Sequence, residues 1–271
     1  MGTQGATGER DAARIAAVLF DLDDTLVADE AATADAFLAT CALARARYGL
    51  DPAGLATAVR RQARHLWQAA PTLDYCRTVG ISSAEGLRAR FIGEDPHLAA
   101  LRAWAPTYRR EAWSAALAGY GVRDDTLAEE LAAALAVERG TRHWVYPDVV
   151  ATLTALRETQ RLALVTNGSP DLQRAKLAGA GLIPYFDAVI VSGEIGAGKP
   201  DARPFALALA ALGVDPARAV MVGDSLERDM VGARNAGIAG IWLDRSGTKA
   251  MDDPTIAVTR TSTLQQLPLL I

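Results

Sequence analysis

Lysine, cysteine and histidine are scarce in this 271-residue sequence, and long apolar runs are missing. Cys41 and Cys76 are too few for a disulfide framework or for a cysteine-based metal site. No stretch approaches the ~18 consecutive apolar residues of a membrane span. The 28 basic and 32 acidic residues give a net charge of -4 without a basic patch. We therefore expect neither nucleic acid nor a membrane as a partner.

Half of the residues are hydrophobic, which is enough for one large α/β domain or for a core with an inserted module. Residues 1–14 are polar and Gly-rich, without the apolar segment of a signal peptide. We expect a cytoplasmic protein that is a monomer or a homodimer. Only Lys176, Lys199 and Lys249 are lysines, so the other 25 of the 28 basic residues are arginine.

Residues 31–144 have the pattern of helices almost throughout, and nothing in this block is typical of a strand. Gly49 stands where a helix C-cap is expected, and Asp51-Pro52 opens the next helix. After Tyr146-Pro147, short apolar strands alternate with helices, which predicts a doubly wound, Rossmann-like α/β fold with a parallel sheet. We expect a catalytic core of residues 1–30 and 145–271, with residues 31–144 inserted as an all-helical cap.

The expected strands cover residues 15–20, 162–165, 188–191, 219–222 and 241–243, and the first of them is followed by acids. Asp21, Asp23 and Asp24 lie within four residues of one another. Neighbouring buried carboxylates repel each other and lose hydration, so such a cluster favours a bound cation. The carboxyl ends of the strands are also where open α/β sheets place their chemistry. For these residues alone, an acidic loop without a catalytic role is an equally good interpretation.

Polar residues follow three further strands. They are Thr166-Asn167-Gly168, then Gly198-Lys199-Pro200 in the loop after the third strand, and Gly223-Asp224 with Asp229 five residues beyond Asp224. A carboxylate nucleophile, an acid, hydroxyl and amide groups and one amine suit phosphoryl transfer through an aspartyl-phosphate. Attack by an anion on a phosphate needs charge neutralisation, which a lysine and a divalent cation supply. Because the available ligands are hard oxygens, we expect Mg²⁺ as the cofactor.

In this order and spacing, the four motifs resemble the haloacid dehalogenase-like hydrolase superfamily, and the helical block resembles its inserted helical cap. The segment from Gly223 to Asp229 and the size of the block are similar to the branch that contains N-acylneuraminate-9-phosphatase and pyrimidine nucleotidases. The resemblance implies a Mg²⁺-dependent phosphatase that acts on a small phosphorylated metabolite. Sugar phosphates, nucleoside monophosphates and phosphoglycolate all remain open as substrates.

The resemblance also implies a role for each motif residue. Asp21 would be the nucleophile and a metal ligand, and Asp23 would be the general acid and base, with its backbone carbonyl on the metal. Asp224 would complete the metal site, and Asp229 would orient water or the lysine from outside it. The substrate phosphate would be bound by Thr166, Asn167, Gly168 and Lys199.

Asp23 separates the branches of the superfamily, because a departing alkoxide must be protonated whereas a halide need not be. The resemblance therefore favours phosphate monoesters over haloacids. A phosphomutase is an alternative, although related mutases usually have Glu-Asp where this chain has Gly223-Asp224. A binding or regulatory protein that has lost activity is another alternative, but no motif position is missing. The run from Gly193 to Lys199 also matches a P-loop, but Pro200 stands where a metal-binding hydroxyl is required.

Overall fold

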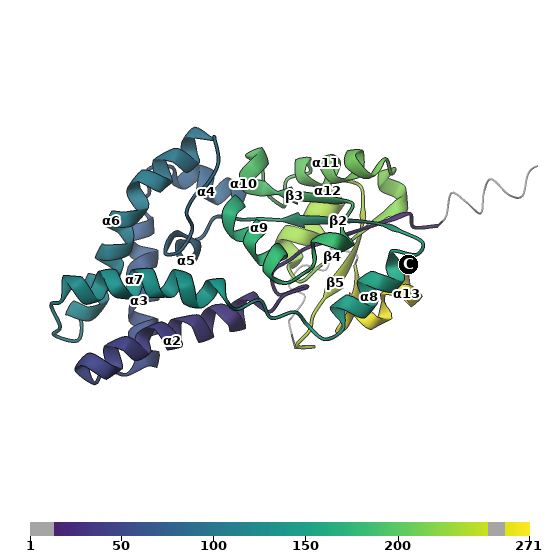
Figure 1. Cartoon of the computed structure of the whole chain (residues 1–271). Helices are drawn as coiled ribbons and strands as arrows, with labels where there is room; N and C mark the ends of the chain where they lie inside the picture. Colours follow the sequence, from purple (N-terminus) through teal and green to yellow (C-terminus); the bar gives the residue numbers. More distant parts are fainter. Residues whose placement is uncertain (1–13, 249–257) are drawn as a thin grey trace, which may run out of the picture.

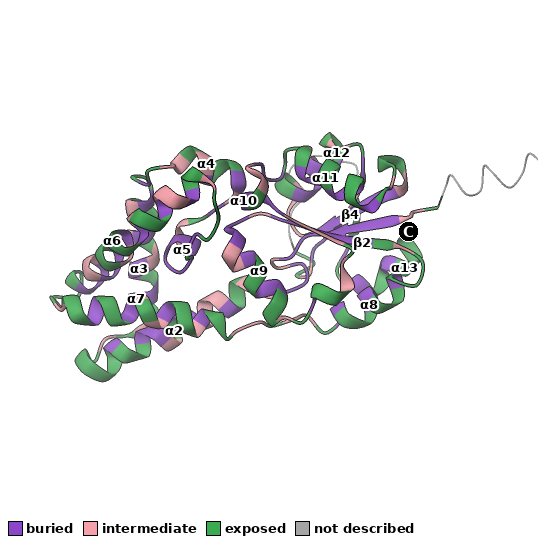
Figure 2. Ribbon diagram, turned by 45° about the horizontal axis from the view of Figure 1, so that its top comes forward, coloured by how far each residue is buried: buried purple, intermediate pink, exposed green. Residues whose placement is uncertain are grey.

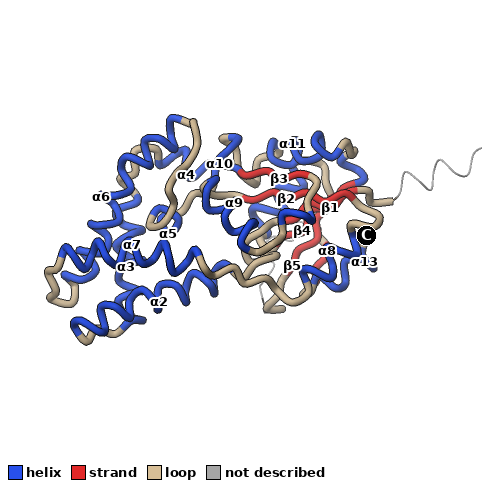
Figure 3. Tube along the Cα trace, in the orientation of Figure 1, coloured by secondary structure: helices blue, strands red, loops and turns tan. Residues whose placement is uncertain are grey.

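The computed structural model describes residues 14–248 and 258–271, so residues 1–13 and 249–257, Lys249 among them, lie outside the described part. Two regions differ in architecture (Figure 1). One contains helices α2 to α7, and the other contains a parallel sheet with helices on both sides. In Figure 3 the strands are confined to the second region, and the first is built from helix and loop only.

The sheet has six strands in the order β3-β2-β1-β4-β5-β6, and all of the pairings are parallel. Strand β1 is central, with Phe20 opposite Leu164 on one side and Val222 on the other. This confirms the doubly wound α/β fold. The strands are β1 (Ala17–Phe20), β2 (Arg161–Thr166), β3 (Ala188–Val191), β4 (Ala219–Gly223), β5 (Ala239–Leu243) and β6 (Thr259–Thr261).

Helices cover both faces of the sheet, because side chains alternate between the two faces along each strand. In β1, Val18 and Phe20 pack in one hydrophobic cluster, whereas Ala17 and Leu19 pack in another. The first cluster includes residues of α8 (Val149–Leu156), α9 (Pro170–Gly179) and α13 (Leu267–Leu270). The second includes residues of α11 (Arg203–Leu212) and α12 (Val231–Asn235).

The helices of the first region have a hydrophobic core of their own, centred on residues such as Phe37 and Trp113. Full burial of a side chain of this size contributes about 1.5–3 kcal/mol. In Figure 2 the central strands are buried, and the outer sides of the helices are exposed. We call this region the helical domain; its helices are α2 (Asp29–Tyr48), α3 (Pro52–Trp67), α4 (Leu73–Val79), α5 (Ser83–Gly86), α6 (Pro96–Ala118) and α7 (Asp125–Gly140).

The expected helix ends at Gly49 and Asp51 are confirmed. Gly49 has a φ of 68°, a left-handed conformation that glycine adopts without steric cost. The Asp51 carboxylate accepts a hydrogen bond from the Gly54 amide at 2.7 Å, as an N-cap side chain does.

Another expected boundary was wrong. Helix α2 begins two residues before residue 31, where the helical block was expected to start. After β4, a π-helix (Leu226–Met230) leads directly into α12, a feature that the sequence pattern did not indicate. Strand β6 and helix α13 were not expected at all, because β6 has three residues without an apolar run and α13 has only four. The remaining short elements are η1 (Ile183–Tyr185), α10 (Ser192–Ile195), η2 (Pro216–Arg218) and η4 (Leu264–Gln266).

Candidate active site

The polar residues that follow β1, β2 and β4 meet at one edge of the sheet, together with Lys199 from the loop after β3. They line a cavity of about 280 Å³, which we call the catalytic cavity. The carboxyl ends of neighbouring parallel strands lie at the same edge, which explains why motifs so far apart in sequence converge. The lining residues are Asp21, Asp23, Asp24, Thr166, Asn167, Lys199, Asp224, Ser225, Arg228 and Asp229.

Lys199 lies between two carboxylates at the bottom of this arrangement. Its Nζ donates to Oδ1 of Asp21 and to Oδ1 of Asp229, at 2.6 Å in each case, and its side chain is almost fully buried. Burial opposes its charge, but Asp21 and Asp229 together raise the pKa of Lys199 to about 12. The ammonium group therefore stays protonated at neutral pH. The partners of Lys199 are carboxylates and helix α11 begins only four residues later, whereas the lysine of a P-loop reaches phosphates from the start of a helix. Both observations argue against the P-loop interpretation.

Three carboxylates can approach a common point. One oxygen atom from each of Asp21, Asp224 and Asp229 lies within 4.8 Å of the others. Both carboxylate oxygens of Asp229 are already engaged, because Oδ1 accepts from Lys199 and Oδ2 accepts from the Ser225 amide at 3.0 Å. The loop that carries Asp224 is held by Trp242, whose Nε1 donates to the Asp224 carbonyl at 3.0 Å. Hard oxygen donors of this kind fit Mg²⁺, so the residues suit the expected cofactor.

Of the four residues expected to bind the substrate phosphate, three line the catalytic cavity and one does not. Thr166 and Asn167 line the catalytic cavity. The Nδ2 of Asn167 donates to the Lys199 carbonyl and its Oδ1 accepts from the Lys199 amide, at 2.9 Å in each case. Gly168 does not line the cavity. Its amide donates to the Ser192 hydroxyl at 2.9 Å and to the Val79 carbonyl at 3.0 Å. The structure therefore brings Thr166, Asn167 and Lys199 to the cavity, and Gly168 to the helical domain.

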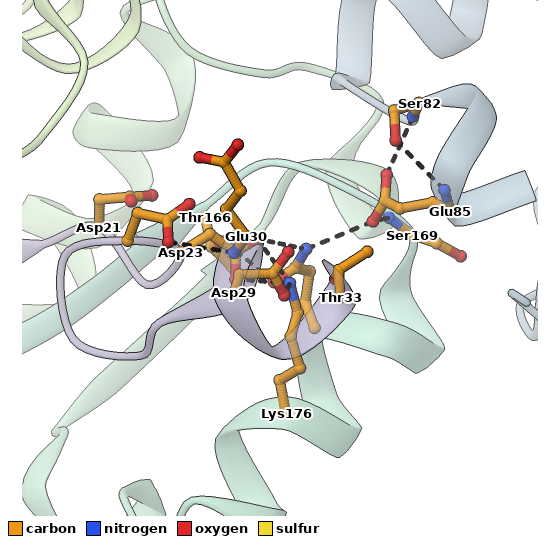
Figure 4. Close-up of polar contacts among 12 residues, drawn as sticks. Asp21, Asp23, Asp29, Glu30, Thr33, Ser82, Glu85, Thr166, Ser169 and Lys176 are labelled. Atoms are coloured by element: carbon orange, nitrogen blue, oxygen red, sulfur yellow. Dashed lines mark hydrogen bonds and ion pairs between the residues drawn. The ribbon is translucent and has the colours of Figure 1, made fainter. Parts of the chain in front are cut away.

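Asp23 has a buried partner that the sequence analysis missed. The Nζ of Lys176, on α9, donates to both carboxylate oxygens of Asp23, at 2.5 Å to Oδ2 (Figure 4). The same Nζ also donates to Oδ1 of Asp29, the first residue of α2, at 3.1 Å. Burial raises the pKa of Asp23, and the Lys176 charge opposes that shift. The scarcity of lysine in the sequence was a signal that could have drawn attention to Lys176.

The contacts of Asp23 extend into the helical domain. Gln173, one turn before Lys176, donates from Nε2 to Asp23 at 3.2 Å and accepts from the Thr166 hydroxyl at 3.2 Å. The same Nε2 lies 3.4 Å from Oε1 of Glu85, and Glu85 forms a capping box with Ser82 at the start of α5. Glu85 and its bonds to Ser82 and Ser169 are visible in Figure 4. Buried polar contacts thus join the carboxylate of Asp23 to both parts of the fold.

Asp29 is held from both sides of the junction between the helical domain and the sheet. It accepts from Lys176 on α9 and from Arg139 on α7. Burial alone would raise the pKa of Asp29, but Lys176, Arg88 and Arg139 together hold it below its usual range. Asp29 is therefore charged at neutral pH and links the two ends of the helical domain to α9.

Comparison with known proteins supports the interpretation of this site. The haloacid dehalogenase-like hydrolase family matches residues 15–237. The chain belongs to this family. A phosphoserine phosphatase from Thermus thermophilus is 43% identical over 229 residues, which is 84% of this chain and 88% of that protein. Human N-acylneuraminate-9-phosphatase is 40% identical over 125 residues, 46% of this chain and 50% of that protein.

Among solved structures of the family, a 2-haloacid dehalogenase from Pseudomonas syringae pv. Tomato superposes with a TM-score of 0.61 and 29% identity. The superposition covers 94% of this chain and 97% of that structure. The expected haloacid dehalogenase-like membership and the expected hydrolase of the phosphatase type are confirmed. Among the described residues, no helix combines the length and the apolar character needed to cross a membrane.

Proposed function

We propose that this hydrolase cleaves small phosphate monoesters through an aspartyl-phosphate on Asp21. The observation that carries the proposal is the contact between the Asp21 carboxylate and the ammonium group of Lys199. Oδ1 of Asp21 accepts from the buried ammonium group, and no hydrogen bond to Oδ2 is present within the described residues. Oδ2 is then the attacking atom, and the lysine neutralises charge as the anionic phosphate approaches. The names of the relatives, both phosphatases of small metabolites, agree with this proposal.

In the proposed reaction, Asp21 Oδ2 forms a bond to phosphorus while the bond from phosphorus to the ester oxygen breaks. Asp23 gives its proton to that departing oxygen. Asp23 then takes a proton from a water molecule, which attacks phosphorus and releases phosphate from Asp21. Thr166 and Asn167 bind the phosphoryl oxygens. Lys176 positions the Asp23 carboxylate, since it holds both oxygens from the side of α9.

The metal site that we propose consists of Asp21, Asp224 and the backbone carbonyl of Asp23, with Asp229 held outside it by Lys199 and Ser225. When bound, Mg²⁺ would neutralise part of the phosphate charge and polarise the phosphorus centre. Asp229 then fixes the lysine instead of binding the ion directly.

We also propose that residues 31–144 act as a cap that excludes water and determines the substrate. The 229-residue match to the phosphoserine phosphatase is longer than the proposed core of residues 1–30 and 145–271, so it extends into the proposed cap. The match to the N-acylneuraminate-9-phosphatase covers only 125 residues. This difference favours an amino-acid phosphate over a sugar-acid phosphate. A cytoplasmic location and a monomeric or dimeric state stay predictions.

A turnover assay tests the proposal. The protein is incubated with 4-nitrophenyl phosphate and with a panel of phosphorylated metabolites, in Mg²⁺ and in excess chelator. We expect turnover only with Mg²⁺, no turnover by the Asp21→Asn variant, and acid-stable labelling of Asp21 by radioactive substrate in the wild type. Circular dichroism and thermal unfolding of Asp21→Asn establish that the fold is intact. Wild-type rates in that variant would exclude the aspartyl-phosphate, and a mutase would transfer phosphate between substrates without releasing it.

A further inference from the structure

A second cavity, of about 350 Å³, lies where α2, α3 and α5 meet; we call it the charged cavity. Asp24 lines both this cavity and the catalytic cavity, so the two share a wall. The other lining residues are Asp29, Glu30, Thr33, Arg60, Ala63, Arg64, Ser83, Ala84 and Leu87. Figure 4 shows Asp29, Glu30 and Thr33 at the start of α2, beside Asp23. The alcohol part of an ester bound at Asp21 is therefore close to this cavity.

Two arginines contribute positive charge to the charged cavity. Arg60 and Arg64 are four residues apart on α3 and so share one face of the helix. The guanidinium carbon of Arg60 lies 4.5 Å from the ring centroid of Phe37, which limits the side chain's freedom. Within the described residues, neither guanidinium group has an ion pair or a hydrogen bond. Two like charges on one helix face repel each other, and an anionic group between them relieves that repulsion.

One carboxylate in the charged cavity, that of Glu30, acts on Arg60 without a direct ion pair: burial lowers the pKa of Arg60, and the charge of Glu30 opposes that shift. Asp29 is occupied by Lys176 and Arg139. Asp24 accepts from the backbone amide of Glu30 at 3.1 Å. The side chain of Glu30 is exposed, and its carboxylate has no hydrogen bond or ion pair to any described residue. The cavity thus presents guanidinium groups on one helix and a carboxylate on another that are not joined in an ion pair, and its wall includes the buried apolar residues Ala63 and Leu87.

We propose that the charged cavity binds the alcohol part of the substrate, and that this part carries both a carboxylate and an ammonium group. The substrate class is then an O-phosphorylated amino acid of the phosphoserine kind. Its carboxylate binds Arg60 and Arg64, and its ammonium group binds Glu30. The volume is near the lower end of the ~300–1,000 Å³ of ligand cavities, which suits an alcohol of this size. This inference rests on the phosphatase function proposed above.

The test compares four esters that differ in the charge of the alcohol part. O-phosphoserine carries both groups, phosphoglycolate only the carboxylate, phosphoethanolamine only the ammonium group, and 4-nitrophenyl phosphate neither. We expect Arg64→Ala to lower kcat/KM for O-phosphoserine and phosphoglycolate by about 10- to 100-fold relative to 4-nitrophenyl phosphate. Glu30→Gln should lower kcat/KM for O-phosphoserine and phosphoethanolamine by a similar factor, again relative to 4-nitrophenyl phosphate.

Two matched controls lie outside the charged cavity. Arg61 follows Arg60 on α3 but lines a different cavity, and Glu111 is exposed on α6. Arg61→Ala and Glu111→Gln should leave all four values of kcat/KM unchanged. The proposal is overturned if Arg64→Ala and Glu30→Gln affect the four esters equally, or if the wild type does not prefer O-phosphoserine to the two singly charged esters.

A binding experiment separates this inference from the proposed function. Calorimetric titration of the Asp21→Asn variant with O-phosphoserine measures binding without turnover. We expect Kd to rise about 10- to 100-fold when Arg64→Ala or Glu30→Gln is added to that variant. Unchanged Kd values would refute the charged cavity as the binding site. Absence of turnover together with charge-dependent binding would instead refute the proposed function and leave the binding site supported.

Discussion

The ammonium group of Lys176 bonds both carboxylate oxygens of Asp23, although 153 positions separate the two residues in the sequence. The Lys176 side chain is 5% exposed, whereas that of Asp23 is 29% exposed toward the catalytic cavity. The lysine thus holds the carboxylate from the buried side and leaves the cavity side open. Asp29 and Gln173 complete this arrangement, so the position of Asp23 depends on α2 as well as on α9.

Lys176→Met is expected to lower kcat for alkyl phosphates by about tenfold or more, because a hydrogen bond to a charged group contributes about 1.5–3 kcal/mol. KM should change little, since Lys176 does not line the catalytic cavity. The loss should be smaller for 4-nitrophenyl phosphate, whose leaving group needs no proton. Arg174→Met is the matched control, because Arg174 lies on the same helix and pairs with Glu194 at the surface. Equal losses for both kinds of ester would show that Lys176 is only structural.

Asp23→Asn is expected to lower turnover of alkyl phosphates by about 10²–10⁴-fold, the usual contribution of a positioned general acid. An amide cannot supply a proton to the departing oxygen, so the loss should decrease as the leaving group becomes a better one. The measurement is kcat/KM for a series of esters with graded leaving-group pKa. A loss that does not vary along the series would reject the proton-donor role.

Lys199→Arg should be almost as damaging to kcat as Lys199→Ala. The ammonium group fits between Asp21 and Asp229 at 2.6 Å from each, in a site where its side chain is only 2% exposed. A planar guanidinium group is larger and has a fixed geometry, so it cannot occupy the same place. Steady-state kinetics of both variants, with thermal unfolding as the control for folding, tests this. Wild-type activity of the arginine variant would contradict the point-charge role.

Asp148 is expected to make the stability of the protein depend on pH. It pairs with Arg245 at 3.1 Å and accepts from Thr263 and the Leu264 amide at 2.9 Å, which ties the start of α8 to the C-terminal segment. Burial alone would raise its pKa, but these bonds lower the pKa of Asp148 below its ordinary value of 3.8. Its contribution to stability is therefore complete well above pH 3.8 and is lost as the pH falls through the lower, folded-state pKa.

Asp148→Asn should accordingly lower the free energy of unfolding by about 1–3 kcal/mol at pH 7. The difference from the wild type should shrink below pH 3.8, where the unfolded state already binds the proton. Urea unfolding at several pH values measures both quantities. Asp74→Asn serves as the control, because Asp74 is 96% exposed and its ion pair with Arg77 contributes little. A difference that stays constant down to pH 3 would contradict this role.

Local patterns in the sequence determined the order of strands and helices and the positions of the four motifs. The placement of strand β1 between β2 and β4 could be predicted as well, because motifs at parallel strand ends must share one edge of the sheet. The meeting of Asp21, Thr166, Lys199 and Asp224 follows from this one rule. Short elements such as β6 escaped prediction, since three residues carry too little pattern to be told from a loop.

The tertiary structure alone decided which side chains surround Asp23 and which line the charged cavity. Lys176, Gln173 and Glu85 lie on helices, and a helical pattern says which face is apolar but not which distant residue a polar side chain will reach. Arg60 and Arg64 are two of 25 arginines, and they line a cavity only because α2 and α5 pack next to α3. Contacts of this kind depend on how whole elements pack together, and packing is determined by the burial of many residues at once.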